Sequence, residues 1–389
     1  MGDKDMMKKI MAVMLAAVFC LAAFVSCGDK ETTDGGTIVL GGIGPLTGGA
    51  ASYGSGVMKG AQLAVDEINA AGGVNGLKFK LAFQDDEHDP EKAVLAYNNL
   101  MDNGMQILIG TVTSKPCVAV VAEADIDNIF MITPSASSVE SIAAPNAFRI
   151  CFSDPNQGIG AAQYIKENNI AEKVAVIYDS SDVYSAGIYE KFATKAQEIG
   201  LEIVTAQAFT SSSATDFSVQ IQKIKDSGAD LLFLPIYYEE AALILEQAHT
   251  AGLDVKYFGC DGLDSLISQL GDKANLAEGV MLLTPFAADA TDEKTVQFTR
   301  AYKRANNGEI PNQFAADAYD AVYTIAAAME KANISDASIS VSDLCDALVA
   351  VMTEIEVDGV TGKMTWNAEG EPTKDPKAMV IKDGAYAAM

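Results

Sequence analysis

The sequence contains few groups suited to acid–base or metal chemistry. Its only histidines are His88 and His249, and its 27 Lys and Arg residues face 53 Asp and Glu residues, giving a net charge of −26. A zinc site needs clustered His, Cys or carboxylate ligands at short spacings, and no such cluster occurs. An acidic chain also repels nucleic-acid phosphates and anionic membrane surfaces. These shortages argue against a metalloenzyme and against nucleic acid as a partner.

Sequence motifs of catalysis and nucleotide binding are missing as well. No HExxH, Walker A or GxSxG segment occurs, and GGIGPLTGG (41–49) departs from the dinucleotide-binding GxGxxG pattern. DDEHDP (85–90) resembles a metal loop, but a loop that caps the next helix explains it without a ligand. His249 is expected on a helix, packed or solvated. We therefore predict binding without turnover, and no metal or cofactor.

Cysteines are sparse and scattered. After Cys27 the chain has Cys117, Cys151, Cys260 and Cys345, without any CxxC pair. Each of the four stands beside apolar residues, which favours buried free thiols. An exported protein leaves disulfides open as an alternative, although no disulfide framework is visible.

The N-terminus has the pattern of an export signal. Lysines precede an uncharged apolar run over 10–25, so residues 1–26 are predicted to be a signal peptide. The run ends FVSC and is followed by polar residues, which resembles the lipobox of bacterial lipoproteins. This resemblance implies lipidation of Cys27, a flexible tether over 27–36, and anchoring at the outer face of the cytoplasmic membrane. An ordinary signal peptide with a chance cysteine is the alternative.

Beyond the tether, short apolar strands alternate with amphipathic helices in two successive series. TIVLGGI (37–43), KFKLAFQDD (78–86), ILIG and FMIT belong to the first series, and KVAVIYD (173–179) opens the second. Such βαβ alternation predicts parallel sheets covered by helices on both faces. The chain is long enough for two domains. We expect an α/β protein with two Rossmann-like lobes.

Hydroxyl and carboxylate side chains gather directly after the predicted strands. These segments read GPLTGGAASYG, DDEHDP, GTVTSKP, TPSASS, YDSSDVYSAG, PIYYEE and CDGLDS, and they contain almost no Lys or Arg. Open α/β sheets bind ligands at the carboxyl ends of their strands. A polar small-molecule site at these strand ends is therefore predicted.

Five segments resemble one known family. GPLTGGAASYGSGVMKGAQLAVDEINAAGGVNG, DDEHDPEKA, MITPSASS, TDFSVQIQKIKDSGADLLFLP and DGVTGKMTWNAEGEP occur in that order. They resemble type I periplasmic binding proteins, in the leucine/isoleucine/valine-binding branch of ABC-importer receptors. The resemblance implies two lobes joined by three hinge crossovers, near 152–154, 283–286 and 357–362. Residues 37–152 with 286–357 would form lobe 1, and 153–285 with 358–389 lobe 2.

The resemblance also assigns ligand-binding roles to individual residues. In the amino-acid binders of the family, hydroxyls and backbone amides of the first lobe hold the ligand carboxylate. The matching positions are Ser114, Ser135, Ala136 and Ser137. The serines could instead cap a helix near Val139.

The remaining roles fall mostly on the second lobe. Asp261 matches the carboxylate that holds the ligand ammonium, although it could also be a helix N-cap. Tyr184 and Tyr237 match aromatic residues that close over the ligand, and Tyr53 matches a residue of the side-chain pocket. Tyr184 could instead be ordinary packing at a helix start, and Tyr237 a core residue at a strand end.

We predict a monomeric, lipid-anchored receptor that delivers an apolar amino acid to an ABC-importer permease. A receptor of the same fold for an amide, urea or aromatic acid, or a ligand sensor, is the alternative. An enzyme is the least favoured class, and it would require His88 or His249 to approach a serine of the cleft.

Overall fold

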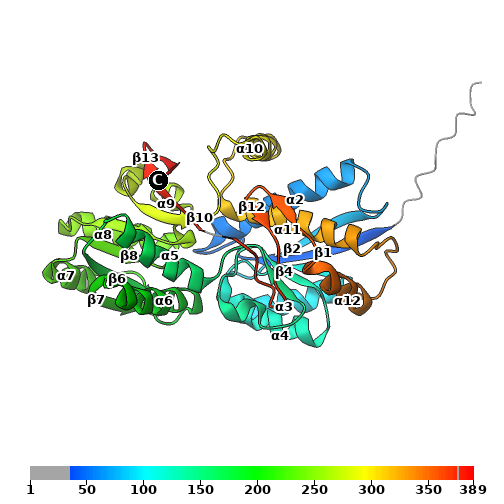
Figure 1. Cartoon of the computed structure of the whole chain (residues 1–389), viewed down its shortest axis with the longest axis horizontal. Coiled ribbons are helices and arrows are strands. Elements are labelled where there is room, and N and C mark those ends of the chain that lie inside the picture. Colours follow the sequence, from blue (N-terminus) through cyan, green and yellow to red (C-terminus); the bar gives the residue numbers. More distant parts are fainter. Residues whose placement is uncertain (1–35, 375) are drawn as a thin grey trace, which may run out of the picture.

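The protein has two α/β lobes that lie side by side (Figure 1). The structure is a computed structural model that describes residues 36–374 and 376–389. The predicted signal peptide, most of the tether and Cys27 lie outside the described residues. Each lobe is built around its own sheet, so the predicted α/β fold with two parallel-sheet lobes is confirmed.

The first lobe contains a five-stranded parallel sheet in the order β2-β1-β3-β4-β5. Side chains alternate across it, so that Ile107 and Ile109 face one core and Leu108 faces the other. The strands and the helices between them are β1 (Thr37–Gly44), α2 (Ala51–Ala70), β2 (Lys78–Asp85), α3 (Pro90–Asp102), β3 (Ile107–Ile109), α4 (Ser114–Ile126), β4 (Met131–Thr133), the 3-10 helix η1 (Val139–Ile142) and β5 (Ala147–Arg149).

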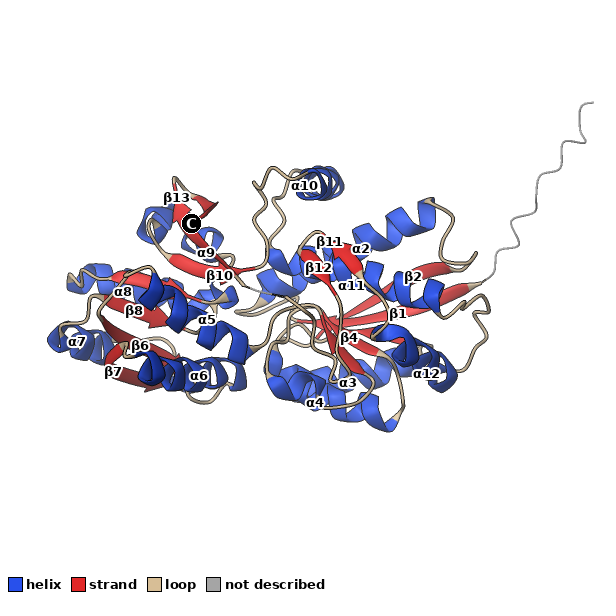
Figure 2. Ribbon diagram, viewed as in Figure 1, coloured by secondary structure: helices blue, strands red, loops and turns tan. Residues whose placement is uncertain are grey.

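The second lobe contains a seven-stranded sheet in the order β14-β13-β10-β9-β8-β6-β7. Its strands from β6 to β10 run parallel, and β13 and β14 add an antiparallel edge (Figure 2). The elements are α5 (Asp154–Glu167), β6 (Lys173–Asp179), α6 (Val183–Ile199), β7 (Glu202–Phe209), η2 (Ser211–Ser213), α7 (Ser218–Ser227), β8 (Leu231–Leu234), α8 (Tyr238–Ala251), β9 (Lys256–Gly259), η3 (Asp261–Leu263), α9 (Leu266–Leu270), η4 (Gly271–Ala277), β10 (Met281–Thr284), β13 (Lys377–Lys382) and β14 (Ala385–Ala388).

Three helices return from the second sheet to the first lobe. They are α10 (Glu293–Ala305), α11 (Gln313–Lys331) and α12 (Val341–Met352). The buried face of α11 packs along α2 and completes one core of the first lobe.

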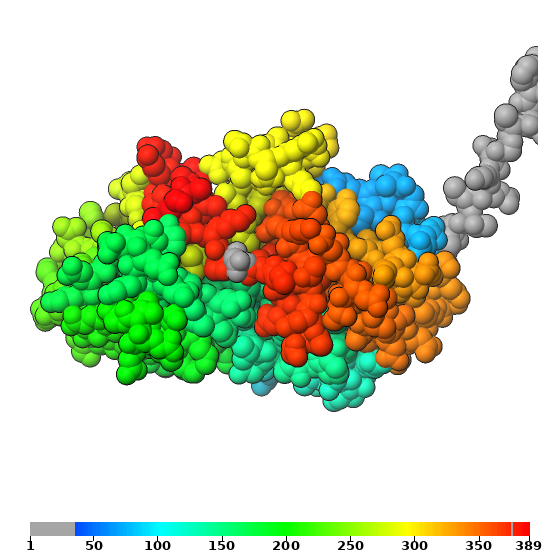
Figure 3. Space-filling view, in the orientation of Figure 1, coloured from blue at the N-terminus to red at the C-terminus, as the bar shows by residue number. Residues whose placement is uncertain are grey.

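The hairpin over 357–364, where the sequence predicted the third crossing between the lobes, packs against the first lobe. The hairpin of β11 (Val357–Gly359) and β12 (Gly362–Met364) contacts α11, because the buried carboxylate of Asp320 accepts hydrogen bonds from the Val360 and Thr361 amides at 2.8 and 2.9 Å. The C-terminal residues then run from the first lobe to the second (Figure 3). We therefore propose that the third crossover comes after Lys374. The sequence did not predict this, because the alternation of GKMTW marks a strand without telling which lobe holds it.

Both sheets share one strand order. Counted along the chain within each lobe, the parallel strands follow the order 2-1-3-4-5. In such sheets the crevice opens where the order reverses, between β1 and β3 in one lobe and between β6 and β8 in the other. The loops after these strands face each other across the lobe junction.

Two further expectations concern the described residues. Cys117, Cys151, Cys260 and Cys345 are buried free thiols, as predicted. None of the helices within 36–374 and 376–389 combines the length and apolar character needed to cross a bilayer.

Candidate ligand-binding site between the lobes

A small cavity of about 220 Å³, a volume that includes space open to solvent, lies where the two lobes meet. Its wall contains most of the residues that the sequence singled out. They are Tyr53, Ser114, Ser135, Tyr184, Tyr237 and Asp261, joined by Val112, Thr113, Gly262 and Phe314. The structure thus brings side chains from five different strand-end segments and from α2 and α11 into one small space.

The first-lobe wall presents hydroxyls whose protons are used differently. The Ser114 Oγ accepts a hydrogen bond from the Ser138 amide at 3.2 Å, so its own proton stays free to be donated. The Ser135 Oγ donates to the Val112 carbonyl at 2.7 Å and therefore keeps only acceptor capacity. Ser114 also opens α4, so the partial positive charge of a helix N-terminus lies at the same place. This wall is suited to an anionic group near Ser114.

Ala136 and Ser137 lie behind this wall. The Ala136 amide donates to the Thr133 Oγ1 at 3.0 Å, and both residues are fully buried without lining the cavity. The helix-cap reading of the serines is wrong, because the residue that precedes η1 is Ser138 and its side chain makes no capping bond.

The second-lobe wall carries a buried carboxylate. Asp261 is 4% exposed, and its Oδ1 accepts a 2.7 Å hydrogen bond from the Tyr184 hydroxyl. Burial raises the pKa of Asp261 to about 7, while hydrogen bonds from Tyr184 and Gln157 partly oppose this shift. Asp261 caps no α-helix, since α9 begins only after Ser265. A buried, ionisable carboxylate of this kind is stabilised by a cation placed against it.

Gln313, at the start of α11, holds the backbone beside Asp261. Its Nε2 donates to the Asp261 carbonyl at 2.9 Å, and its amide donates to the Asp264 Oδ2 at 2.7 Å. Since Gln313 follows the second crossover, a first-lobe helix fixes the position of a second-lobe strand end.

Three tyrosines form the remaining walls. The rings of Tyr184 and Tyr237 stack with centroids 4.7 Å apart. Tyr53 packs against Phe314 at 4.2 Å, and its hydroxyl donates to the Gly262 carbonyl at 2.6 Å. The last bond joins α2 of the first lobe to η3 of the second, so the two lobes are closed on each other.

The sequence missed several residues of the cavity. Val112 and Phe314 contribute apolar surface, and Gln157 contacts the Asp261 amide from α5 at 3.1 Å. Val112 lies within the predicted GTVTSKP loop (110–116) and could have been found there. Phe314 and Gln157 belong to α11 and α5, so they do not stand among the polar residues that follow the strands.

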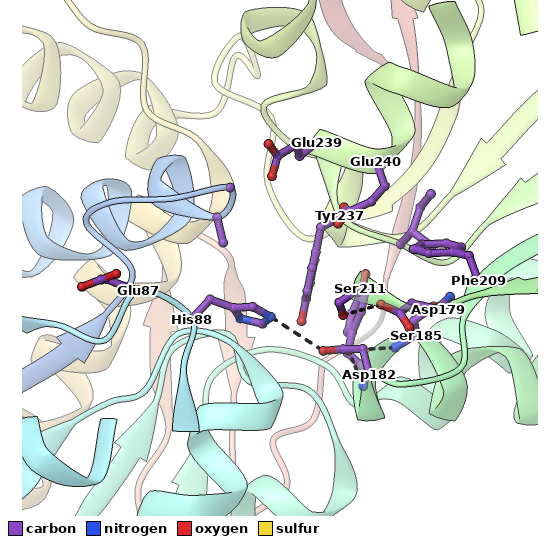
Figure 4. Close-up of a pocket in the computed structure, with 14 residues that line it drawn as sticks. Glu87, His88, Asp179, Asp182, Ser185, Phe209, Ser211, Tyr237, Glu239 and Glu240 are labelled. Carbon is purple, nitrogen blue, oxygen red and sulfur yellow. Dashed lines mark hydrogen bonds and ion pairs between the residues drawn. The ribbon is translucent and has the colours of Figure 1, made fainter. Parts of the chain in front are cut away.

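A second, larger cavity of about 650 Å³, a volume that includes space open to solvent, shares Tyr184 and Tyr237 with the first, and Figure 4 shows its lining. It holds His88, whose Nδ1 lies 2.8 Å from the Thr113 Oγ1 and whose Nε2 lies 3.8 Å from the Asp182 Oδ2 across the lobe junction. Burial lowers the pKa of His88 and raises that of Asp182. His88 thus approaches a threonine rather than a cleft serine, while His249 is exposed on α8. Asp89, which follows His88 in the DDEHDP loop, caps α3, as the sequence suggested for this loop.

Comparison with known proteins identifies the class of protein. The family model described as "Periplasmic binding protein" matches residues 37–385. The chain therefore belongs to the periplasmic binding protein family, and the resemblance to its type I, leucine/isoleucine/valine-binding branch is confirmed.

Three individual proteins are similar over most of their length. The Leu/Ile/Val-binding protein homolog 3 of Brucella melitensis is 32% identical, covering 93% of this chain and 95% of that one. The leucine-, isoleucine-, valine-, threonine- and alanine-binding protein of Pseudomonas aeruginosa is 31% identical, covering 83% and 84%. The structure of the branched-chain amino acid transporter substrate binding protein LivJ from Streptococcus pneumoniae, in complex with isoleucine, has a TM-score of 0.81 at 30% identity, covering 90% and 98%. This chain is accordingly a solute-binding protein and not an enzyme.

Proposed function

We propose that this protein is the extracytoplasmic receptor of an ABC importer and binds an apolar, branched-chain-type amino acid between its lobes. The observation that carries the proposal is the pairing of opposite chemistries across one cavity between the lobes. A free hydroxyl proton and a helix N-terminus at Ser114 stand on one side, and the buried carboxylate of Asp261 stands on the other. An α-amino acid zwitterion carries the two complementary charges at short separation.

Each part of the ligand has a matching partner in this proposal. The ligand carboxylate accepts from the Ser114 hydroxyl, which replaces some of the water that it loses on burial. The ammonium lies against Asp261 and donates to the Ser135 Oγ, whose own proton is engaged elsewhere. The side chain packs on the apolar surface of Tyr53, Val112 and Phe314.

The isoleucine complex of the similar pneumococcal protein supports this ligand class. Binding to both walls holds the lobes together, so ligand shifts the population toward the closed form that the importer permease recognises. The transported solute is the only ligand in this scheme, and the receptor acts as a monomer.

A thermal melt of residues 28–389 tests the ligand class. The twenty amino acids are compared with urea, small amides and benzoates. A ligand at 100 times its dissociation constant adds about 2.7 kcal/mol, which raises the melting temperature by roughly a few degrees in a protein of this size. A shift with leucine, isoleucine or valine supports the proposal. A shift only with urea, an amide or a benzoate would replace it with the alternative cargo class.

We further propose that Cys27 is lipidated and tethers the receptor to the outer face of the cytoplasmic membrane. The apolar run that ends at FVSC carries this proposal. Replacing Cys27 with Ala should move the protein from the membrane fraction into the soluble exported fraction. A variant that stays in the membrane fraction after the same treatment would contradict lipid anchoring at Cys27.

A further inference from the structure

A fully buried arginine lies directly behind the serine turn of the cavity. Arg149, at the end of β5, is 0% exposed, and its Nη1 donates to the carbonyls of Ala136 and Ser137 at 3.3 and 2.5 Å. Its Nη2 lies 3.1 Å from the Glu371 Oε1. A guanidinium is costly to bury unless its N–H groups form hydrogen bonds or ion pairs. We therefore expect Arg149 to have a role that an apolar residue could not have.

The two carbonyl bonds control which way the turn presents its amides. In a trans peptide the C=O and N–H groups point in opposite directions. Because Arg149 draws the Ala136 and Ser137 carbonyls toward itself, the Ser137 and Ser138 amides are turned away from it. The Ser138 amide indeed donates to the Ser114 Oγ at 3.2 Å, which leaves the Ser114 proton free for a ligand carboxylate.

The same turn is tied to the first crossover. The Ser137 carbonyl also accepts from the amide of Asp154, the first residue of α5, at 2.9 Å. One carbonyl oxygen thus has a donor from each lobe, since Arg149 closes the first sheet and Asp154 opens the first helix of the second lobe.

The backbone of Arg149 is tied to the chain that leads into the third crossover. Its amide donates to the Gly370 carbonyl at 3.1 Å, and the Trp366 Nε1 donates to its carbonyl at 2.7 Å. Gly370 has φ +80°, and a Cβ there would lie 2.3 Å from the Ala147 carbonyl oxygen, so only glycine allows this approach. Glu371 then reaches the guanidinium, and the ligand turn and two crossovers meet at one residue.

We propose that Arg149 is a positioning residue that orients the Ser137–Ser138 peptides, so that Ser114 can donate to the ligand, and that it links this orientation to the connections between the lobes. Arg149 does not line the cavity and does not touch the ligand. The inference rests on the proposed function, because only a ligand with an anionic group uses the Ser114 proton.

The experiment compares two full-length variants that each lose one buried cation. Arg149→Met removes the carbonyl bonds, while Lys374→Met removes a cation that pairs with Asp317 at 3.1 Å and contacts Thr361, away from the turn. Two measurements are made on each variant and on the wild type. One is amide hydrogen exchange at Ala136, Ser138 and Asp154 without ligand, and the other is the dissociation constant for L-isoleucine. Arg149→Lys, which keeps one donor group, is included as a partial rescue.

The expected result is at least tenfold faster exchange at the three amides and at least tenfold weaker binding of L-isoleucine in Arg149→Met. Arg149→Lys should lie between that variant and the wild type, and Lys374→Met should stay within about threefold of the wild type in both measurements. Wild-type exchange at the three amides in folded Arg149→Met would overturn the positioning role. An equal effect of Lys374→Met would overturn it too, by showing a general loss of packing.

The exchange measurement needs no ligand, so it judges the positioning role even if the wild type fails to bind L-isoleucine. A wild type that binds no amino acid in the thermal melts overturns the proposed function instead. Fast exchange with unchanged L-isoleucine affinity would show that the turn is held by Arg149 without serving the ligand, and this result also overturns the inference.

Discussion

The two walls of the cavity differ in how far other groups of the protein satisfy their polar and charged atoms. On the first-lobe wall, hydroxyls bond to backbone groups: the Ser114 Oγ accepts from the Ser138 amide, and the Ser135 Oγ donates to the Val112 carbonyl. On the second-lobe wall, Asp261 is a buried acid that forms no ion pair with any residue that the structure describes, and its pKa is raised to about 7. The first wall is arranged in advance, whereas the second wall carries an electrostatic cost that a cationic ligand group can relieve.

This difference separates two contributions to recognition. A preorganised neutral wall supplies direction and costs little when the site is empty. A buried carboxylate supplies most of the discrimination, because removing the cation opposite a buried charge leaves that charge uncompensated. Substitutions on the two walls should therefore differ in size and in their dependence on pH.

Asp261→Asn should cause the largest loss of amino-acid affinity. The variant leaves the ligand ammonium buried without its anion, and breaking a buried pair costs about 3–5 kcal/mol, or roughly 10²-fold to several thousandfold in the dissociation constant. Isothermal titration with L-isoleucine measures this loss. Retention of the wild-type dissociation constant would contradict the role of Asp261.

The unliganded Asp261→Asn protein serves as its own folding control. The folded-state pKa of Asp261, about 7, lies above the unfolded value of about 3.9, so its contribution to stability is lost as pH rises between these values. Asparagine does not ionise, so the Asp261→Asn protein does not lose this stability as pH rises. The variant should melt no lower than the wild type at pH 8, and a clear fall would indicate misfolding instead.

Ser114→Ala should have the next largest effect. It removes a hydrogen bond to a charged ligand group, worth about 1.5–3 kcal/mol, so the dissociation constant should rise by roughly 10 to 10²-fold. The matched variant Ser135→Ala should lose less, because the ligand ammonium keeps its main partner, the Asp261 carboxylate, when the Ser135 Oγ is removed. Equal losses in both variants, measured by the same titration, would show that the two hydroxyls are not used differently.

Amino-acid affinity should fall as pH drops below about 7. The ligand ammonium stabilises the ionised form of Asp261, so binding requires deprotonation of a group whose free pKa is about 7. Below that value affinity should decrease about tenfold per pH unit until the pKa of the complex is reached. Titrations from pH 8 to pH 5.5 test this slope, and Asp261→Asn should abolish it even though His88 and Asp182 titrate nearby.

Tyr53→Phe should have the smallest effect. It removes the 2.6 Å bond to the Gly262 carbonyl, which joins the two lobes, and keeps the ring against Phe314. A neutral hydrogen bond is worth about 1 kcal/mol, so affinity should fall about fivefold. Small-angle scattering with and without L-isoleucine should show a more open unliganded form, and an unchanged form would mean that this bond does not hold the lobes closed.

Much of the architecture was readable from the sequence, because apolar strands alternating with amphipathic helices leave few packing options. The strand KVAVIYD (173–179) has the bounds that its pattern predicted. The position of GKMTW was harder to predict, because a short alternating segment fits any sheet edge. Its first-lobe position follows from contacts with distant residues, such as the bond from the Trp366 Nε1 to the Arg149 carbonyl.

The sequence predicted only the part of the site that lies at strand ends. Strand ends are visible in the sequence, so Ser114, Ser135 and Asp261 could be found there. Phe314 reaches the cavity only because α11 returns from the second crossover to pack on α2, and Arg149 acts from behind the turn through backbone carbonyls. Neither contact leaves a local signal, since both depend on residues far apart in the chain.

The four buried thiols make this receptor convenient for optical sensing. Cys117, Cys151, Cys260 and Cys345 are shielded from labelling reagents, and residues 28–389 contain no other cysteine. Burial also raises the pKa of Cys260 and Cys151, which keeps them protonated and unreactive. A single cysteine added at an exposed position on the rim of the cleft could therefore carry one fluorophore, whose emission would follow the solute concentration without removal of any native residue.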